Sequence, residues 1–201
     1  ETIMFSDIVI ATGNSHKISE IEAIMSPMAI RWIGGTSIDV GHIEESGETY
    51  EENALIKARA FARVSGLPCL ADDSGLEVDA LDGLPGVRSN RLFGEHLTDA
   101  EKVQELLRRI KDVPEKKRTA RFISHAVLAT VDNVLVSCRG IVEGRIQFEP
   151  SGCGGFGYDP VFWSIELETT FAEATGEQKS RVSHRGRAMR QVKEFLLHSM
   201  E

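Results

Sequence analysis

The chain has 201 residues, of which 41% are hydrophobic and 27% are charged, and its net charge at pH 7 is −8. This composition is ordinary for a globular protein, and the length suits one domain spanning residues 1–201. No apolar run approaches the ~20 residues of a membrane span, and a nucleic-acid binder would normally carry a basic face, so we expect neither membrane nor nucleic-acid contact.

Short apolar runs predict strands, and longer amphipathic runs predict helices. In chain order, we expect strands at 8–11, 67–71, 76–78, 122–131, 134–142 and 160–163. Helices are expected at 16–25, 50–64, 99–111 and 183–198. Thr49 and Thr98 each begin a capping box, and residues 131–134 are typical of a hairpin turn. Helices mixed with strands and a hairpin predict an α/β fold with a mixed sheet.

The cysteines and one basic cluster do not indicate a catalytic or metal-binding site. Cys69, Cys138 and Cys153 are widely spaced and form no CxxC pair, so we expect free, buried thiols in a reducing cytoplasm. No signal peptide is visible at the N-terminus, which also favours a cytoplasmic location. The cluster of Lys116, Lys117, Arg118 and Arg121 is expected to form a solvated turn between a helix and a strand.

The first predicted strand runs into a small polar turn, Thr12-Gly13-Asn14-Ser15-His16-Lys17, and then into a helix. Free backbone N–H groups at such a helix start bind phosphate well. Lys17 falls in the first helical turn, where the helix dipole disfavours a cation, and a bound anion would remove that conflict. An exposed lysine on an ordinary turn would also explain this residue.

Two further regions carry cations in unusual places. At helical spacing, Lys57 falls in the apolar arc of the second helix, with Tyr50 and Val64 on either side of it, while Arg59 and Arg63 lie opposite. The last helix begins with Ser183-His184-Arg185-Gly186-Arg187, and Lys179 lies just before it. Lys57 could snorkel to solvent. Three misplaced cations nevertheless favour one shared anionic ligand.

A glycine-rich segment, Gly152-Cys153-Gly154-Gly155-Phe156-Gly157-Tyr158-Asp159-Pro160, precedes the last predicted strand. Glycines allow close backbone approach and unusual backbone angles. Phe156 and Tyr158 could stack on a flat ring. A plain flexible loop would explain the glycines, but it explains the aromatic pair and Asp159 less well.

Adjacent carboxylates, Asp72 and Asp73, follow an apolar run in the segment Ala-Asp-Asp-Ser-Gly. If the ligand is a polyphosphate, Mg2+ is expected with it, held by one or two carboxylates, and Glu44 and Glu45 are further candidates. Neighbouring strand residues point to opposite faces, so we expect one aspartate to serve the metal and the other to brace a neighbour. A surface Asp-Ser-Gly turn would explain either carboxylate, but not the apolar approach to both.

Six segments, in this order, resemble the inosine/xanthosine triphosphate pyrophosphatase family: Thr12–Lys17, Glu44–Ala58, Ala71–Leu81, Leu84–Arg91, Gly154–Pro160 and Thr170–Gly186. The resemblance implies an elongated mixed β-sheet flanked by helices, with two lobes and a central substrate cleft. It also implies a homodimer that uses Mg2+ to hydrolyse non-canonical purine nucleoside triphosphates (dITP, ITP, XTP) to the monophosphate and pyrophosphate.

The resemblance further implies roles for individual residues. Phosphate contacts would come from Thr12, Gly13, Asn14, Lys17 and Lys57, and Ser15 and His16 would also bind the substrate. Glu45 and Asp73 would hold the metal, with Asp73 accepting a proton from the attacking water, and Ser74 would contact the nucleotide. The base and sugar would lie against Phe156, Gly157, Tyr158 and Asp159. The 6-oxo edge of the purine would be read by Lys179, His184 and Arg185.

The chain departs from the family pattern at Arg88, Asn90 and Leu92. These differences affect the expected shape of the pocket and the dimer contact more than the expected reaction.

Two alternatives remain open. One is a pyrophosphatase of the same reaction class that prefers pyrimidine or modified nucleotides. The other is a nucleotide sensor that binds without catalysis.

Overall fold

The computed structural model describes residues 5–26, 28–94 and 96–199. Its strands form a 7-stranded sheet in the order β2-β1-β3-β4-β5-β6-β7. They are β1 (Asp7–Ile10), β2 (Arg31–Gly34), β3 (Cys69–Val78), β4 (Thr119–Ala129), β5 (Val134–Ile146), β6 (Phe162–Ser164) and β7 (Thr169–Thr170). The helices are α1 (Ser15–Met25), α2 (Tyr50–Ser65), α3 (Asp99–Arg109), α4 (Gly176–Val182) and α5 (His184–Ser199). The pairs of β1 with β2 and β3 are parallel, whereas β6 pairs antiparallel with β5 and β7, which confirms the predicted α/β fold with a mixed sheet.

The chain divides into two compact units that each contain several chain segments. The first unit comprises Glu1–Asp73, Ser124–Gly140 and Arg185–Glu201, and the second comprises Ser74–Ile123 and Ile141–His184. Strands β3, β4 and β5 contribute residues to both units, because each unit boundary in these strands falls inside the strand.

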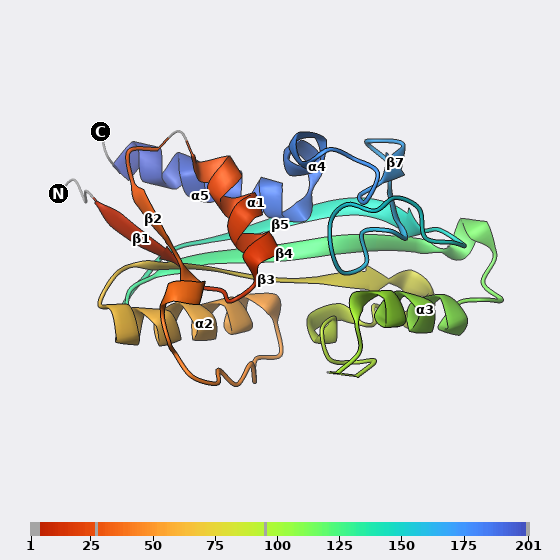
Figure 1. Cartoon of the computed structure of the whole chain (residues 1–201), viewed down its shortest axis with the longest axis horizontal. Coiled ribbons are helices and arrows are strands. Elements are labelled where there is room, and N and C mark those ends of the chain that lie inside the picture. The colour runs from red at the N-terminus through yellow and green to blue at the C-terminus, as the bar shows by residue number, and fades with distance from the viewer. Residues whose placement is uncertain (1–4, 27, 95, 200–201) are drawn as a thin grey trace. The chain divides into compact units, whose positions relative to one another are not determined.

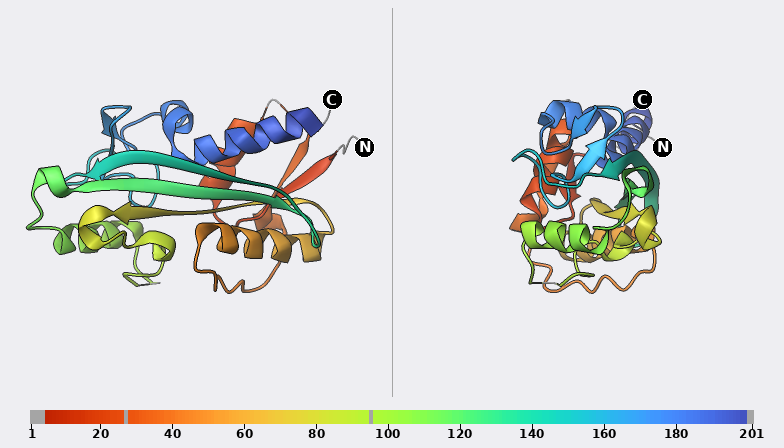
Figure 2. Two further views of the ribbon diagram at one scale, coloured as in Figure 1. Left: turned by 180° about the vertical axis from the view of Figure 1, so that it is seen from behind. Right: turned by 90° about the vertical axis from the view of Figure 1, so that its right-hand side faces the viewer.

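In the first unit, helices α1 and α5 cover one face of the sheet and α2 covers the other (Figures 1 and 2). Strand residues alternate between these two layers. Ile8, Ile10 and Leu70 pack in the core cluster with α1 and α5. Val9, Cys69 and Ala71 pack in the cluster with α2. Because side chains alternate along a strand, each β3 side chain of this unit faces either α1 and α5 or α2.

The second unit has its own core. Residues of β3, β4 and β5 there pack with α3 and with the segment that leads into β6. The cluster contains three phenylalanines, and the rings of Phe122 and Phe162 lie 4.6 Å apart between centroids. Large aromatic side chains supply much of the buried apolar area of this unit.

Helix starts and stops follow local sequence signals. The capping boxes at Thr49 and Thr98 are both present, and so is the one at Thr175 that begins α4. Helix α2 ends at Gly66, whose φ of 69° lies in the left-handed region that favours glycine. The predicted positions of α1, α2, α3 and α5 agree with these elements to within a few residues.

The largest correction concerns β3. Two short strands were expected at 67–71 and 76–78, but the structure has one strand that continues from Cys69 to Val78. Asp72 and Asp73 lie inside it, so the alternative of a surface turn is wrong. Strands β2 and β7 were not predicted, because they are only 4 and 2 residues long and lack a clear apolar alternation.

Three smaller expectations also need correction. Val64 is 56% exposed, since it lies at the rim of the buried face of α2. Cys153 is exposed, although Cys69 and Cys138 are buried and all three thiols are free. Arg118 is buried rather than solvated, and its guanidinium donates hydrogen bonds to the carbonyls of Ile110 and Ile146. No helix in the described residues is long and apolar enough to cross a membrane.

Candidate active site

Asp72 lies on the face of β3 that is covered by α1 and α5, and two cations reach it. The ammonium of Lys17, from the first turn of α1, lies 2.9 Å from Asp72 Oδ2. Arg185, from the first turn of α5, donates to the same oxygen through Nε at 3.1 Å and Nη2 at 2.9 Å. The hydroxyl of Ser124 on β4 donates to the other oxygen, Oδ1. Asp72 is thus fully engaged as a counterion.

Asp73 lies on the opposite face, which is covered by α2. The ammonium of Lys57 lies 2.7 Å from Asp73 Oδ1 and 3.4 Å from Glu45 Oε1. The second oxygen of Asp73, Oδ2, is buried and has no hydrogen-bond partner in the structure. A buried carboxylate oxygen without a partner is unusual and calls for a ligand such as water or an ion.

Strand alternation therefore explains why two aspartates stand side by side in a buried strand. Each faces a different helical layer, and each meets a lysine from that layer. The prediction that neighbouring aspartates serve different roles is consistent with this geometry. The first aspartate braces Lys17 and Arg185, and the second has one buried oxygen, Oδ2, without a hydrogen-bond partner.

The pKa values of the two aspartates move in opposite directions. Burial alone would raise the pKa of Asp72, but Arg185 and Lys17 outweigh it and hold that pKa well below its usual range. Burial raises the pKa of Asp73, and Lys57 offsets this only in part. Asp73 is accordingly the more basic carboxylate of the pair, which suits a proton acceptor.

The pKa values of Lys17 and Lys57 are shifted by burial and by these same carboxylates. Burial lowers the pKa of Lys17, although Asp72 opposes the shift. For Lys57, burial lowers the pKa, but Asp73 and Glu45 together outweigh it and leave the pKa raised. Neither lysine snorkels, since their exposed fractions are 8% and 9%. Their burial is balanced by internal carboxylates and does not by itself require a ligand.

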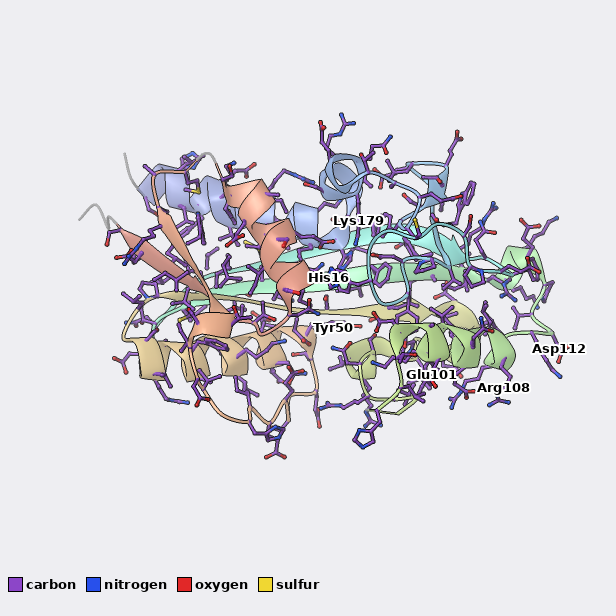
Figure 3. The ribbon with its side chains drawn as sticks, viewed as in Figure 1. His16, Tyr50, Glu101, Arg108, Asp112 and Lys179 are labelled. Carbon is purple, nitrogen blue, oxygen red and sulfur yellow. The ribbon has the colours of Figure 1, made fainter. Side chains whose placement is uncertain are left out.

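The turn between β1 and α1 begins the helix with an asparagine cap. Asn14 Oδ1 accepts hydrogen bonds from the backbone N–H of His16 and of Lys17. Gly13, Asn14, Ser15 and His16 are exposed, Thr12 is half-buried, and the first turn of α1 carries no acidic residue. His16 lies at the N-terminal end of α1, and Tyr50 at that of α2 (Figure 3). This turn is an exposed helix start of the kind that binds anions.

Asn53 holds the segment that carries Glu45. Its side chain is fully buried and forms two hydrogen bonds with the backbone of Gly47, accepting from N at 2.8 Å and donating to O at 3.4 Å. A Cβ on Gly47 would lie 2.7 Å from Asn53 Oδ1, so only glycine fits. Asn53 was not among the site residues expected from the sequence. Its full burial is what reveals this function.

The residues at Asp73 suit a divalent cation, although no group of three or more ligating side chains occurs in the described part of the chain. Mg2+ usually takes only one or two carboxylates and fills its other positions with substrate phosphates and water. Glu45 and Asp73 both approach Lys57, and Asp73 Oδ2 is without a partner. Such a donor set fits Mg2+.

In the second unit, Lys179 and Asp159 form a buried pair. Lys179 Nζ lies 2.6 Å from Asp159 Oδ2, and the same oxygen accepts a hydrogen bond from the N–H of Phe156 at 2.9 Å. The ammonium also lies 4.9 Å from the centroid of the Phe156 ring. Lys179 is thus held between a carboxylate and an aromatic face, with an exposed fraction of 6%. Figure 3 labels its position on α4.

The other expected residues of this unit differ in burial and in hydrogen bonding. Tyr158 belongs to the core, and its hydroxyl donates to the carbonyl of Ser89 at 3.0 Å, which places its ring in packing. His184 is buried and stacks on Phe122 with 4.7 Å between ring centroids. Gly157 N–H donates to Asp99 Oδ2 at 2.7 Å, and Ser74 is half-buried on β3.

The structure thus brings the expected residues together in three groups, two in the first unit and one in the second. In the first unit Lys17, Asp72 and Arg185 share one face of β3, and Lys57, Asp73 and Glu45 share the other. In the second unit Phe156, Asp159 and Lys179 are in mutual contact. The sequence did not identify Ser124 or Glu20, whose partners Asp72 and Arg185 lie 52 and 165 residues away. It also did not identify Asn53, although its partner Gly47 lies only 6 residues away.

The fold and these groups define a mixed-sheet α/β protein with buried lysine–carboxylate sites. A model of the Ham1 family matches residues 8–195. The dITP/XTP pyrophosphatase of Shigella flexneri is 46% identical over 187 residues, which covers 91% of this chain and 94% of the relative.

Solved structures agree with this sequence similarity. A HAM1 protein from Coxiella burnetii matches with a TM-score of 0.87 and 40% identity, over 97% of this chain and 100% of that one. The Staphylococcus aureus Ham1 protein matches with a TM-score of 0.83 and 36% identity, over 96% and 98%. The chain belongs to the Ham1 family.

Proposed function

We propose that this chain hydrolyses non-canonical purine nucleoside triphosphates such as dITP, ITP and XTP to the monophosphate and pyrophosphate. The named relatives that it matches over most of its length are dITP/XTP pyrophosphatases. The observation that carries the proposal is Asp73, a buried carboxylate with one oxygen on Lys57 and the other without a partner.

One set of residues is proposed to contact the polyphosphate. Lys57 and Lys17 supply positive charge, and the exposed helix start of α1 offers backbone N–H groups through Thr12, Gly13, Asn14, Ser15 and His16. Glu45 and Asp73 would hold Mg2+, which when bound offsets phosphate charge during the reaction. Asp72 keeps Lys17 in place, because the two share a buried ion pair.

In the proposed reaction, a water oxygen attacks the α-phosphorus and the bond to the leaving pyrophosphate breaks. Asp73 accepts the proton of that water, which requires the carboxylate to be ionised and within hydrogen-bond reach. The lysine ammonium groups stabilise the charge that develops on the leaving group. The products are the nucleoside monophosphate and pyrophosphate.

A second set of residues is proposed to contact the nucleoside. Ser74, Phe156, Gly157, Tyr158 and Asp159 would lie against the base and sugar. Lys179, His184 and Arg185 would contact the 6-keto edge, with Arg185 oriented by its bonds to Asp72 and Glu20. A donor at this edge rewards a keto group and leaves an unsatisfied clash with the amino group of adenine.

The remaining features are proposed at the level of the whole chain. We propose that residues 1–201 act as one nucleoside triphosphate pyrophosphatase domain, that two copies form a homodimer, and that the protein works in the cytoplasm on the nucleotide pool. The family membership and the resemblance of the sequence motifs support this proposal.

The Asp73→Asn variant tests the catalytic assignment, because it keeps the shape of the side chain but removes its basicity. We expect pyrophosphate release from ITP with Mg2+ to fall by about 10²–10⁴-fold, while the fold and most nucleotide binding remain. Asp112→Asn, at an exposed aspartate of the second unit, is the control. Wild-type turnover in Asp73→Asn would refute the assignment.

A panel of nucleoside triphosphates tests the substrate class. We expect pyrophosphate to be released much faster from dITP, ITP and XTP than from ATP and the pyrimidine triphosphates. Preference for a pyrimidine would favour the related pyrophosphatase activity. Binding of ITP without release of pyrophosphate would favour a nucleotide sensor.

A further inference from the structure

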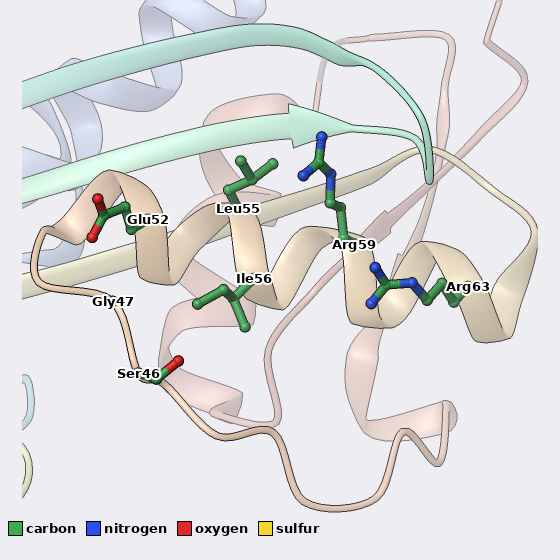
Figure 4. Close-up of a pocket in the computed structure, with 7 residues that line it drawn as sticks. All are labelled: Ser46, Gly47, Glu52, Leu55, Ile56, Arg59 and Arg63. Atoms are coloured by element: carbon green, nitrogen blue, oxygen red, sulfur yellow. The ribbon is translucent and has the colours of Figure 1, made fainter.

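A cavity of about 340 Å³ lies on α2, on the side of the helix that faces away from Lys57. Its lining consists of Ser46, Gly47, Glu52, Leu55, Ile56, Arg59 and Arg63. Figure 4 shows the two arginines extending from the C-terminal half of α2, while Ser46 comes from the segment that precedes the helix. Cavities of this size hold small molecules.

The two arginines are not used by the proposed catalytic groups. Arg59 Nε is buried and has no hydrogen-bond partner. Within residues 5–26, 28–94 and 96–199, no ion pair to Arg59 or Arg63 is found, although the chain carries 31 acidic against 23 basic residues. Burying a guanidinium N–H without an acceptor is costly, so an anion in the cavity would relieve that cost.

The rest of the lining narrows the class of anion. One carboxylate oxygen of Glu52, Oε2, accepts hydrogen bonds from the N–H groups of Glu48 and Thr49, which offset part of its negative charge. Ser46 adds an exposed hydroxyl, and Leu55 and Ile56 form a half-buried apolar wall. Two guanidinium groups and a hydroxyl suit a phosphoryl group, and the wall suits an organic body attached to it.

We propose that this cavity is a second anion site, which binds a small organic phosphomonoester with its phosphate on Arg59 and Arg63 and its body against Leu55 and Ile56. The site is separate from Lys17 and Lys57, because Arg59 lies two residues beyond Lys57 and therefore on the other side of the helix. A ligand there would contact Ser46 and Gly47, which directly follow Glu45.

Phenyl phosphate is a suitable probe, because it has the charge and the apolar body but no purine or triphosphate. Its binding to the wild-type chain without added metal is measured by calorimetry. The double variant Arg59→Gln/Arg63→Gln should weaken binding by about tenfold or more, as expected for loss of charged hydrogen bonds. Lys111→Gln/Lys116→Gln, which removes two exposed cations of the second unit, should leave it unchanged.

Three other results would overturn the proposal. The first is that phenyl phosphate does not bind the wild type, and the second is that it binds the double arginine variant equally well. The third is that binding is lost in Lys17→Gln instead, which would place the probe at the catalytic lysines.

Arg63→Gln alone, at an exposed position, serves if the double variant does not fold. Inorganic phosphate as a second probe should bind more weakly than phenyl phosphate, and equal binding would refute the role of the apolar wall. Since no turnover is measured, failure here leaves the proposed pyrophosphatase function untouched.

Discussion

At the scale of single residues, the central feature is the division of labour between Asp72 and Asp73. The two carboxylates are chemically identical and adjacent, yet one faces two buried cations, whereas the other faces one lysine and keeps a buried oxygen without a hydrogen-bond partner. Their pKa values are displaced in opposite directions for this reason. Environment, and not residue type, therefore separates a bracing group from a reactive one.

Replacing Asp72 by asparagine should destabilise the protein strongly. Lys17 and Arg185 would remain buried without their shared counterion, and breaking a buried pair in this way costs about 3–5 kcal/mol. Urea denaturation compared with the wild type measures the loss in the free energy of unfolding. Asp112→Asn should cost little, because Asp112 pairs with Lys111 only at an exposed surface. If Asp72→Asn lost no more free energy of unfolding than Asp112→Asn, Asp72 would not brace the two cations.

The same residue predicts a dependence of stability on pH. The pKa of Asp72 in the folded protein is depressed from its ordinary value of 3.8, so its stabilisation is fully present above that value. It is lost as the pH falls through the lower pKa of the folded state. The difference in unfolding free energy between wild type and Asp72→Asn should therefore be constant above pH 3.8 and shrink below it.

At the scale of elements, the segment before α2 is held to the helix by side chains of the helix, above all by Asn53 and Glu52. Asn53 bonds both the N–H and the carbonyl of Gly47, which lies two residues after Glu45. The capping box of Thr49 and Glu52 begins the helix at the same place. Position and orientation of Glu45 thus depend on contacts made by residues of α2 that never touch a ligand.

Asn53→Ala should weaken metal binding at Glu45 and Asp73. Release of Gly47 loosens the segment that carries Glu45, and loss of such supporting partners typically lowers metal affinity by about 10–100-fold. Mn2+ binding followed by electron paramagnetic resonance measures this without turnover. Asn90→Ala, at an exposed asparagine of the second unit, is the control. Unchanged Mn2+ affinity in Asn53→Ala would show that Asn53 only supports the fold.

At the scale of the whole molecule, the sheet passes through two units that each have a core of their own. One unit carries the lysine–carboxylate groups on both faces of β3, and the other carries Lys179 and Asp159 beside an aromatic ring. Continuous strands allow residues of one segment, such as Asp73 and Ser74, to belong to different units while remaining covalent neighbours.

We expect the protein to sediment as a homodimer. Analytical ultracentrifugation should give twice the chain mass of 22.2 kDa at micromolar concentration. A particle of 22.2 kDa across the accessible concentration range would contradict the proposed dimer without affecting the assignment of Asp73.

The local pattern of the sequence determined α1, α2, α3 and α5, the long strands β4 and β5, and the residue types at the site, but not the continuity of β3. Capping boxes, helical periodicity and apolar runs act over a few residues, so they can be read without the fold. Polar residues in apolar surroundings, such as Lys57 and the two aspartates, could likewise be recognised as unusual.

Only the tertiary structure decided which charges neutralise one another. Asp72 meets Lys17 from 55 residues and Arg185 from 113 residues away, and it lies inside a continuous strand that the sequence had divided into two. The same holds for Arg118, whose partners are carbonyl groups of distant segments. Such pairings depend on the sheet bringing remote segments together, and no local periodicity encodes them.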